Sequence, residues 1–213
     1  AMFLVQITLN NTLTYYGALS HYGEDIPLAC VGVISKVNIL MLGFTLGISQ
    51  GCQPIFSYNY GARQYSRVRE AYRKAIVAAS VLCCIAFVCF QLFPRPIVAL
   101  FDPSGSEEYF QFAERYFRIY MFMTLANAFQ PITANFFTSI GKAKRGALIA
   151  LTRQVIFLIP LILIFPLFLG IDGVMYAGPI ADSAAVVVAL ALVTREMKRM
   201  PHVDEPVAAD TLV

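Results

Sequence analysis

The chain has 213 residues, of which 58% are hydrophobic and only 14% are charged, and its mean hydropathy is +0.66. Soluble globular proteins carry about 25% charged residues, so this composition excludes an ordinary soluble domain and predicts a membrane protein. The formal net charge of +3 does not indicate nucleic-acid binding, because the cations are concentrated where apolar stretches end.

Six apolar stretches long enough to cross a bilayer follow one another along the chain. The predicted membrane helices cover residues 2–20, 26–58, 72–93, 110–139, 146–169 and 173–194. The predicted fold class is therefore an all-α membrane protein, with one lobe of six transmembrane helices in residues 1–200. Residues 201–213 are short and polar, which predicts a disordered cytoplasmic tail.

Positive charge is present in every second connection between these helices. Twelve of the sixteen Lys and Arg residues form three clusters: Arg63, Arg67, Arg69, Arg73 and Lys74; Lys142, Lys144, Arg145 and Arg153; and Arg195, Lys198 and Arg199. The clusters follow the second, fourth and sixth predicted helices, whereas the other connections have a net acidic bias. Because positively charged loops remain cytoplasmic, we expect a multi-pass protein of the cell membrane with both ends of this segment in the cytoplasm.

Polar side chains form stripes on two of the predicted helices. Gln6, Asn10 and Thr14 share one face of the first helix, and Thr124, Asn127 and Gln130 share one face of the fourth. Amides in hydrocarbon need partners, so both stripes should face other helices or water. Two interpretations follow: hydrogen bonds between helices, or the polar wall of a substrate cavity formed by Gln6, Asn10, Thr14, Asn127 and Gln130.

Lys36 and Asp182 are ionisable residues deep inside predicted helices, where such groups indicate function by default. The second and sixth helices run in the same direction, so the two side chains are expected at similar depths and able to pair. The alternatives are a structural ion pair or snorkelling of the side chains, and a role in ion coupling or substrate contact. The sequence shows no nucleophile–base pair, phosphate loop or metal cluster, which predicts a protein that is not an enzyme and has no cofactor.

The second predicted helix contains regularly spaced glycines. Gly43, Gly47 and Gly51 are spaced four residues apart, a pattern that predicts close approach of another helix. Gly61 is expected to end this helix in a left-handed conformation.

The end of the second helix carries a specific motif. The run from Gly51 to Ala62, which contains Gln53, Pro54, Asn59, Tyr60 and Gly61, resembles the signature of multidrug and toxic compound extrusion (MATE) transporters. The later run from Phe136 to Ala143 is similar to the family pattern after the fourth helix of a half. The resemblance covers residues 2–200. It implies a transporter of twelve helices in two lobes, of which this chain is the C-terminal lobe, with the N-terminal six-helix lobe as its missing partner.

The implied function is export of organic cations and other amphipathic drugs by proton or sodium antiport across the lipid bilayer. Some branches place coupling carboxylates in the helices that correspond to the first and fourth here, where this chain has only amides. It is therefore similar to the branch whose coupling carboxylate lies in the other lobe, and Asp182 is the remaining candidate in this chain. Two alternatives stay open: a lipid-linked saccharide flippase of the same superfamily, and a non-transporting six-helix scaffold subunit.

Overall fold

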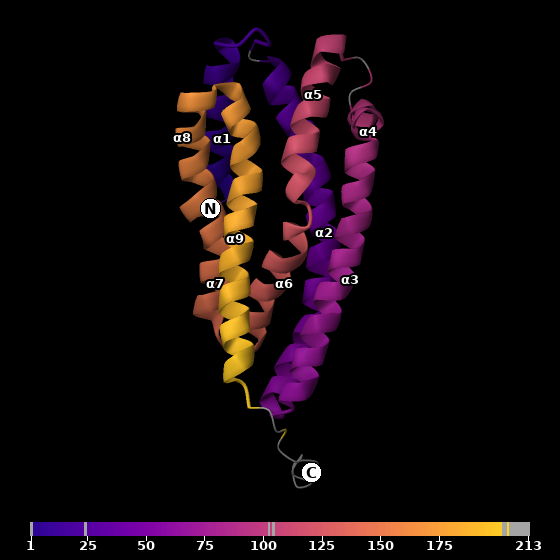
Figure 1. Cartoon of the computed structure of the whole chain (residues 1–213), viewed down its shortest axis with the longest axis vertical. Coiled ribbons are helices and arrows are strands. Elements are labelled where there is room, and N and C mark those ends of the chain that lie inside the picture. Colours follow the sequence, from indigo (N-terminus) through magenta and orange to yellow (C-terminus); the bar gives the residue numbers. More distant parts are fainter. Residues whose placement is uncertain (1, 24, 102, 104, 202–203, 205–213) are drawn as a thin grey trace.

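The computed structural model describes residues 2–23, 25–101, 103, 105–201 and 204, without the side chains of Met2 and Asn127. This part of the chain is helical and contains no strand, which confirms the predicted all-α membrane fold. The helices run up and down in one bundle (Figure 1). Most of the predicted tail, residues 202–203 and 205–213, lies outside the described residues.

The described helices correspond to the six predicted passes, several of them built from more than one helical segment. In chain order the elements are α1 (Met2–Ala18), α2 (Asp25–Gly61), α3 (Tyr65–Leu92), α4 (Pro94–Phe101), α5 (Glu107–Tyr120), η1 (Met121–Met123), α6 (Ala126–Ser139), α7 (Ala143–Leu151), η2 (Thr152–Leu158), α8 (Ile159–Leu169) and α9 (Ile171–Arg199). In the part of the chain that the structure describes, four stretches are long and apolar enough to span a membrane: α2, α3, the continuous α7–η2–α8 segment, and α9.

Two passes are not the single helices that the sequence predicts. The fourth is interrupted by the 3₁₀ turn η1, so α5 and α6 are separate helices. The fifth contains a π-helical stretch, η2, immediately before Pro160. A proline cannot donate to the preceding turn and its ring crowds the carbonyl four residues earlier. The wider π turn accommodates that crowding, and π turns are frequent at functional sites.

The third pass begins earlier than predicted and is followed by an unexpected short helix. The predicted start at residue 72 followed the apolar run, whereas α3 begins at Tyr65 and includes part of the basic cluster. Glu70 and Lys74 form an i,i+4 ion pair at 2.7 Å on this polar first section. The connection after α3 contains the helix α4, which begins at Pro94, a residue well suited to a first helical turn.

Aromatic side chains join α2, α3 and α6 into one packing unit. Phe56 and Phe136 are fully buried and meet edge to face, with ring centroids 5.3 Å apart. Tyr72 contacts Phe136 at 4.9 Å, and its hydroxyl is 2.7 Å from that of Thr133. Ser49 on α2 donates to the carbonyl of Pro131 and accepts from the Asn135 amide at 2.7 Å. This junction thus combines apolar burial with satisfied polar groups.

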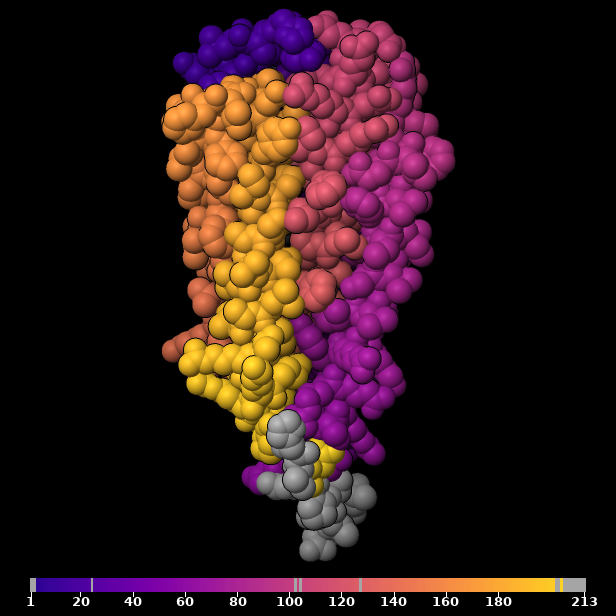
Figure 2. Space-filling view, in the orientation of Figure 1, coloured from indigo at the N-terminus to yellow at the C-terminus, as the bar shows by residue number. Residues whose placement is uncertain are grey.

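The last helix, α9, packs along several of the others. It contacts α5, α6, α8 and η2. In Figure 2 its surface, orange at the start and yellow at the end, lies between the other orange segments and the rest of the bundle. Small residues permit this approach: an added Cβ at Gly178 would lie 2.6 Å from the Tyr120 ring, and one at Gly173 would lie 2.5 Å from the Phe165 backbone. These positions require glycine because the facing atoms leave no space for a side chain.

The glycine face of α2 does not pack in the way expected. Gly43, Gly47 and Gly51 are exposed, and among the described residues nothing lies within 4 Å of a Cβ added to any of them. The buried face of α2 is instead formed by residues such as Thr45, Ser49 and Phe56. Within this part of the chain, the small-residue pattern therefore marks an open surface.

The end of α2 differs in detail from the prediction. The helix does end at Gly61, but Gly61 is not the left-handed residue; that conformation belongs to Arg63, with φ 55°. Ala62 and Gln64 close the turn by donating backbone hydrogen bonds to the carbonyls of Tyr58 and Asn59, both at 2.9 Å. The turn is thus completed two residues later than the glycine suggested.

Three segments meet at the lower end of the bundle in Figure 1: the end of α2, the α6–α7 connection and the end of α9. Most residues of the three basic clusters therefore lie at one end of the bundle. Near this end the last described residue contacts α3: the backbone N–H of Ser66 donates to Asp204 at 2.9 Å, and its hydroxyl donates to the second carboxylate oxygen. These hydrogen bonds lower the pKa of Asp204 below its usual range.

Candidate functional site

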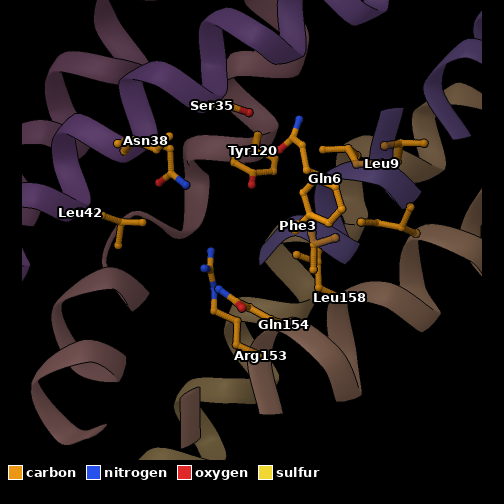
Figure 3. A pocket seen from close by; sticks show the side chains of 15 residues that line it. Phe3, Gln6, Leu9, Ser35, Asn38, Leu42, Tyr120, Arg153, Gln154 and Leu158 are labelled. Carbon is orange, nitrogen blue, oxygen red and sulfur yellow. The ribbon is translucent and has the colours of Figure 1, made fainter. Parts of the chain in front are cut away.

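A cavity of about 440 Å³ opens between α1, α2, α5, η2, α8 and α9. Apolar side chains such as Phe3, Leu42 and Leu158 form much of its wall (Figure 3). Its polar lining residues are Gln6, Ser35, Asn38, Tyr120, Arg153 and Gln154. An apolar wall with a few polar groups is the usual character of a small-molecule site.

An ion pair lies at the edge of this cavity. The Nε of Arg153 donates to Oδ1 of Asp182, and the two side chains are only 12% and 10% exposed. Arg153 lines the cavity, whereas Asp182 is not among its lining residues. In Figure 3 the guanidinium reaches into the cavity on the side facing Asn38 and Leu42. The cation is thus presented to the cavity while its counter-charge lies outside the lining.

The irregular segments place these polar groups. Arg153 and Gln154 are consecutive residues of the π-helical stretch η2, and both line the cavity. Tyr120 is the last residue of α5, directly before η1. The two interruptions of the helical pattern therefore lie beside the same cavity, which fits the tendency of π turns to occur at functional sites.

The first predicted stripe reaches the cavity through one residue. Gln6 lines it and donates its amide to Oδ1 of Asn10 at 3.1 Å, so the stripe is hydrogen-bonded along α1. Asn10 is half-buried and is not among the lining residues. Thr14 is exposed and contributes to a separate shallow pocket with Asn11.

The described residues of the second stripe are hydrogen-bonded, Gln130 to another helix and Thr124 within its own pass. The Gln130 amide donates to the carbonyl of Ile149 at 3.1 Å and so links α6 to α7. The hydroxyl of Thr124 is buried and donates to the carbonyl of Met121 at 2.5 Å. Asn127 lies in α6, but its side chain is outside the described set. The hydrogen-bonding interpretation holds for Gln130, and a cavity role for Asn10, Thr14, Asn127 and Gln130 remains a prediction.

The predicted pairing of Lys36 with Asp182 is wrong. Asp182 is bonded to Arg153, and Lys36 is exposed on α2 although its neighbour Ser35 lines the cavity. A similar depth in the membrane is not enough for two side chains to pair, because the helix faces that carry them must also point toward each other. The contact between α9 and η2 brings Arg153, not Lys36, to the carboxylate.

Arg153 is the main residue that sequence reasoning missed. It was grouped with Lys142, Lys144 and Arg145 as a cytoplasmic cluster, yet it lies seven residues after the predicted helix start at residue 146. An arginine two turns inside an apolar helix is itself a sign of a functional position, so the signal was present. For Ser35, Asn38 and Gln154 the sequence carried no comparable signal.

Two other residues of the second basic cluster form a different contact. Lys142 and Arg145, at the start of α7, both donate to the carboxylate of Glu196 on α9, which is 1% exposed. The Arg145 guanidinium also lies 5.9 Å from the centroid of the Phe137 ring. This cluster ties the α6–α7 turn to the end of α9, at the end of the bundle where the basic residues gather.

The two family-like motifs pack against each other. Phe56 belongs to the run from Gly51 to Ala62, and Phe136 begins the second run. Their edge-to-face contact buries both rings fully. Elsewhere in the first run, the Asn59 amide donates to the carbonyl of Ile55 at 2.8 Å and stabilises the end of α2. These contacts give the motifs a structural role at the end of the bundle.

Comparison with known proteins agrees with this architecture. The MatE family profile matches residues 1–164 of the chain. The multidrug export protein MepA of Staphylococcus aureus (strain bovine RF122 / ET3-1) is 23% identical over 192 residues, which cover 90% of this chain and 42% of that protein. The chain therefore spans less than half the length of this curated relative.

Solved structures give the same result. The MATE multidrug transporter DinF-BH is 32% identical with a TM-score of 0.76, and the match covers 91% of this chain and 42% of that one. An outward-facing multidrug resistance MATE family transporter of the MOP superfamily has a TM-score of 0.83 at 19% identity, over 93% of this chain and 43% of that one. The second likeness shows the fold alone. The profile match, which covers more than half of the chain, shows that the chain belongs to the MATE family of membrane transporters.

Proposed function

We propose that this chain is the C-terminal half of a secondary active transporter that exports organic cations and other amphipathic drugs by proton or sodium antiport. The observation that carries the proposal is the cavity of about 440 Å³, whose apolar walls are interrupted by a few amide, hydroxyl and guanidinium groups. Such a wall suits varied amphipathic compounds because apolar contact is not directional and the polar groups are few. Similarity to a protein named for multidrug export supports the same substrate class.

The second half of the transporter is part of the proposal. The chain corresponds to 42–43% of the length of its relatives, and the glycine face of α2 is open. A second lobe facing α1 and α2 would cover these surfaces and enclose the cavity. The coupling carboxylate would then lie in that lobe, since α1 and α6 carry amides and no acid.

The test is ion-driven efflux by the full-length protein in liposomes. A fluorescent cationic dye present at equal concentration on both sides of the membrane should be depleted from the lumen when an inward proton or sodium gradient is imposed, and it should stay when that gradient is dissipated. Movement of a labelled lipid-linked saccharide without dye efflux would instead favour the flippase alternative. Absence of both activities in folded protein would favour the scaffold alternative.

A further inference from the structure

The cavity presents one charge to a ligand, and that charge is positive. Arg153 is the sole ionic side chain among the described lining residues, and its partner Asp182 is not part of the lining. The nearest other lining groups from α1, α2, α5 and η2 are neutral amides and hydroxyls, namely Gln6, Ser35, Asn38, Tyr120 and Gln154. A cationic ligand in this cavity would therefore meet a like charge with no carboxylate facing it.

The guanidinium has capacity for a second acceptor. A guanidinium carries five N–H donors in a planar fork, and the bond to Asp182 uses Nε. The remaining donors belong to the two Nη atoms at the tip, and Figure 3 shows that tip in the cavity. A carboxylate matches this geometry because its two oxygens accept from neighbouring N–H groups of one fork.

The surroundings favour an acceptor attached to an apolar body. Phe3, Leu42 and Leu158 provide apolar surface, and the low dielectric of such a wall strengthens any hydrogen bond to a charged group. The Asp182 carboxylate behind Arg153 fixes the guanidinium in place, so little side-chain entropy is lost when a ligand binds. The site is thus pre-organised for an anionic group.

We infer that the cavity binds an amphipathic organic carboxylate, with the ligand's anionic group on the Nη side of Arg153 and its apolar body against the α1, α2 and η2 walls. Asp182 is a positioning residue that holds the guanidinium. The inference rests on the proposed function only in treating the cavity as a substrate site. The charged group of a cationic drug would lie away from Arg153, and its apolar body would still contact the apolar wall of the cavity.

The test compares two fluorescent probes that share the anthracene ring system and differ in charge: anthracene-9-carboxylate and 9-(aminomethyl)anthracene. Binding of each to the full-length protein in detergent is measured by fluorescence anisotropy. The double variant Arg153→Gln/Asp182→Asn removes both charges and keeps the pair neutral. We expect the Kd of the carboxylate to rise at least tenfold in this variant, while the Kd of the amine stays within twofold or falls.

Lys36→Gln is the matched control, because it removes one exposed cation from the neighbouring helix without touching the cavity. It should leave both Kd values unchanged. Arg153→Lys, which keeps the charge but loses the fork, should weaken only the carboxylate, about threefold, and serves as the test if the double variant elutes as aggregate. An unchanged carboxylate Kd, or an equal rise for both probes, would overturn the inference. Failure of dye efflux with this binding pattern intact would count against the proposed function alone.

Discussion

At the scale of single residues, Arg153 and Asp182 form the most consequential contact of the lobe. Removing two charges from water is costly, and their attraction in a low-dielectric interior repays that cost only when the geometry is good. The net stability of such a pair is therefore small. The loss of one partner is different, because the charge that remains is buried without compensation.

Asp182→Asn should accordingly lower the free energy of unfolding by about 3 kcal/mol. The measurement is the melting temperature of the full-length protein in detergent, together with its folded yield. Lys36→Gln is the control and should change stability by less than about 0.5 kcal/mol, since that side chain is exposed. Normal yield with complete loss of ion-driven efflux in Asp182→Asn would show instead that the carboxylate carries the coupling ion.

Replacing two glycines of the family-like motifs with alanine should change stability in opposite directions. Gly61 lies in helix α2 with open space around its Cα, so Gly61→Ala should be neutral or raise stability by up to about 1 kcal/mol. Gly141 has φ 78°, a conformation that costs a residue with a Cβ about 1 kcal/mol, so Gly141→Ala should destabilise by that amount. Melting temperatures of the two variants, measured in parallel, check the difference. A larger loss at Gly61 would mean that another part of the protein packs on it.

Side-chain direction is what the sequence could not provide at this scale. Lys36 and Asp182 were correctly seen as charges inside apolar helices, but the partner of Asp182 depends on which faces of α2, η2 and α9 meet. The periodicity of Gln6 and Asn10 was informative, because residues four apart share a face and these two are hydrogen-bonded.

At the scale of elements, the length of the apolar runs predicts where the membrane passes lie, but it does not predict where those passes depart from a regular α-helix. A run such as α9 is long and apolar enough to be recognised without its neighbours. The 3₁₀ turn η1 and the π turn η2 are departures from ordinary helical hydrogen bonding within apolar runs. Pro160 gave a local hint of the second, whereas the residues of η1, Met-Phe-Met, gave none. The π turn lines the cavity with Arg153 and Gln154, and the 3₁₀ turn begins directly after the lining residue Tyr120.

The contact between α7 and α9 leads to a prediction at this scale. Glu196 is buried and accepts from both Lys142 and Arg145, so Glu196→Gln leaves two cations without their shared carboxylate. We expect a loss of about 2–3 kcal/mol, seen as a lower melting temperature. Glu70→Gln is the matched control: its pair with Lys74 is exposed, so it should leave the melting temperature unchanged. Equal effects of the two substitutions would show that the α7–α9 contact does not stabilise the lobe.

At the scale of the whole molecule, the positions of the basic residues predict the orientation in the membrane. Three chain segments that carry most of the Lys and Arg residues meet at one end of the bundle (Figure 1). Since such ends remain in the cytoplasm, reporters fused after Lys74, Arg145 or Lys198 should be cytoplasmic. Reporters fused near residues 24, 104 and 172 should be external, as measured by paired phosphatase and fluorescent-protein fusions. A cytoplasmic signal from the fusion near residue 104 would contradict the six-helix arrangement.

The surface of the lobe also predicts how it assembles. Gly43, Gly47 and Gly51 form an exposed small-residue face on α2, with the exposed amide of Gln50 beside it. Gln6 on α1 is exposed as well. In a bilayer, small residues permit close helix packing, and an amide that faces lipid costs on the order of 1 kcal/mol when it has no partner. These features describe a face that is stable only when another set of helices covers it.

The chain expressed alone should therefore dimerise or aggregate in mild detergent and show no transport. Co-expression with the second half of the transporter should restore a monodisperse particle, because the second lobe covers the α1 and α2 faces and closes the cavity. Size-exclusion chromatography with light scattering measures the first outcome, and dye efflux from liposomes measures the second. Gly47→Leu tests the cause: on an open face it adds volume without a clash inside the lobe, so it should leave the amount of chain inserted in the membrane unchanged and block pairing of the halves. A stable, fully active monomer of the chain alone would refute the half-transporter account, since its exposed polar and small-residue face would then need no partner.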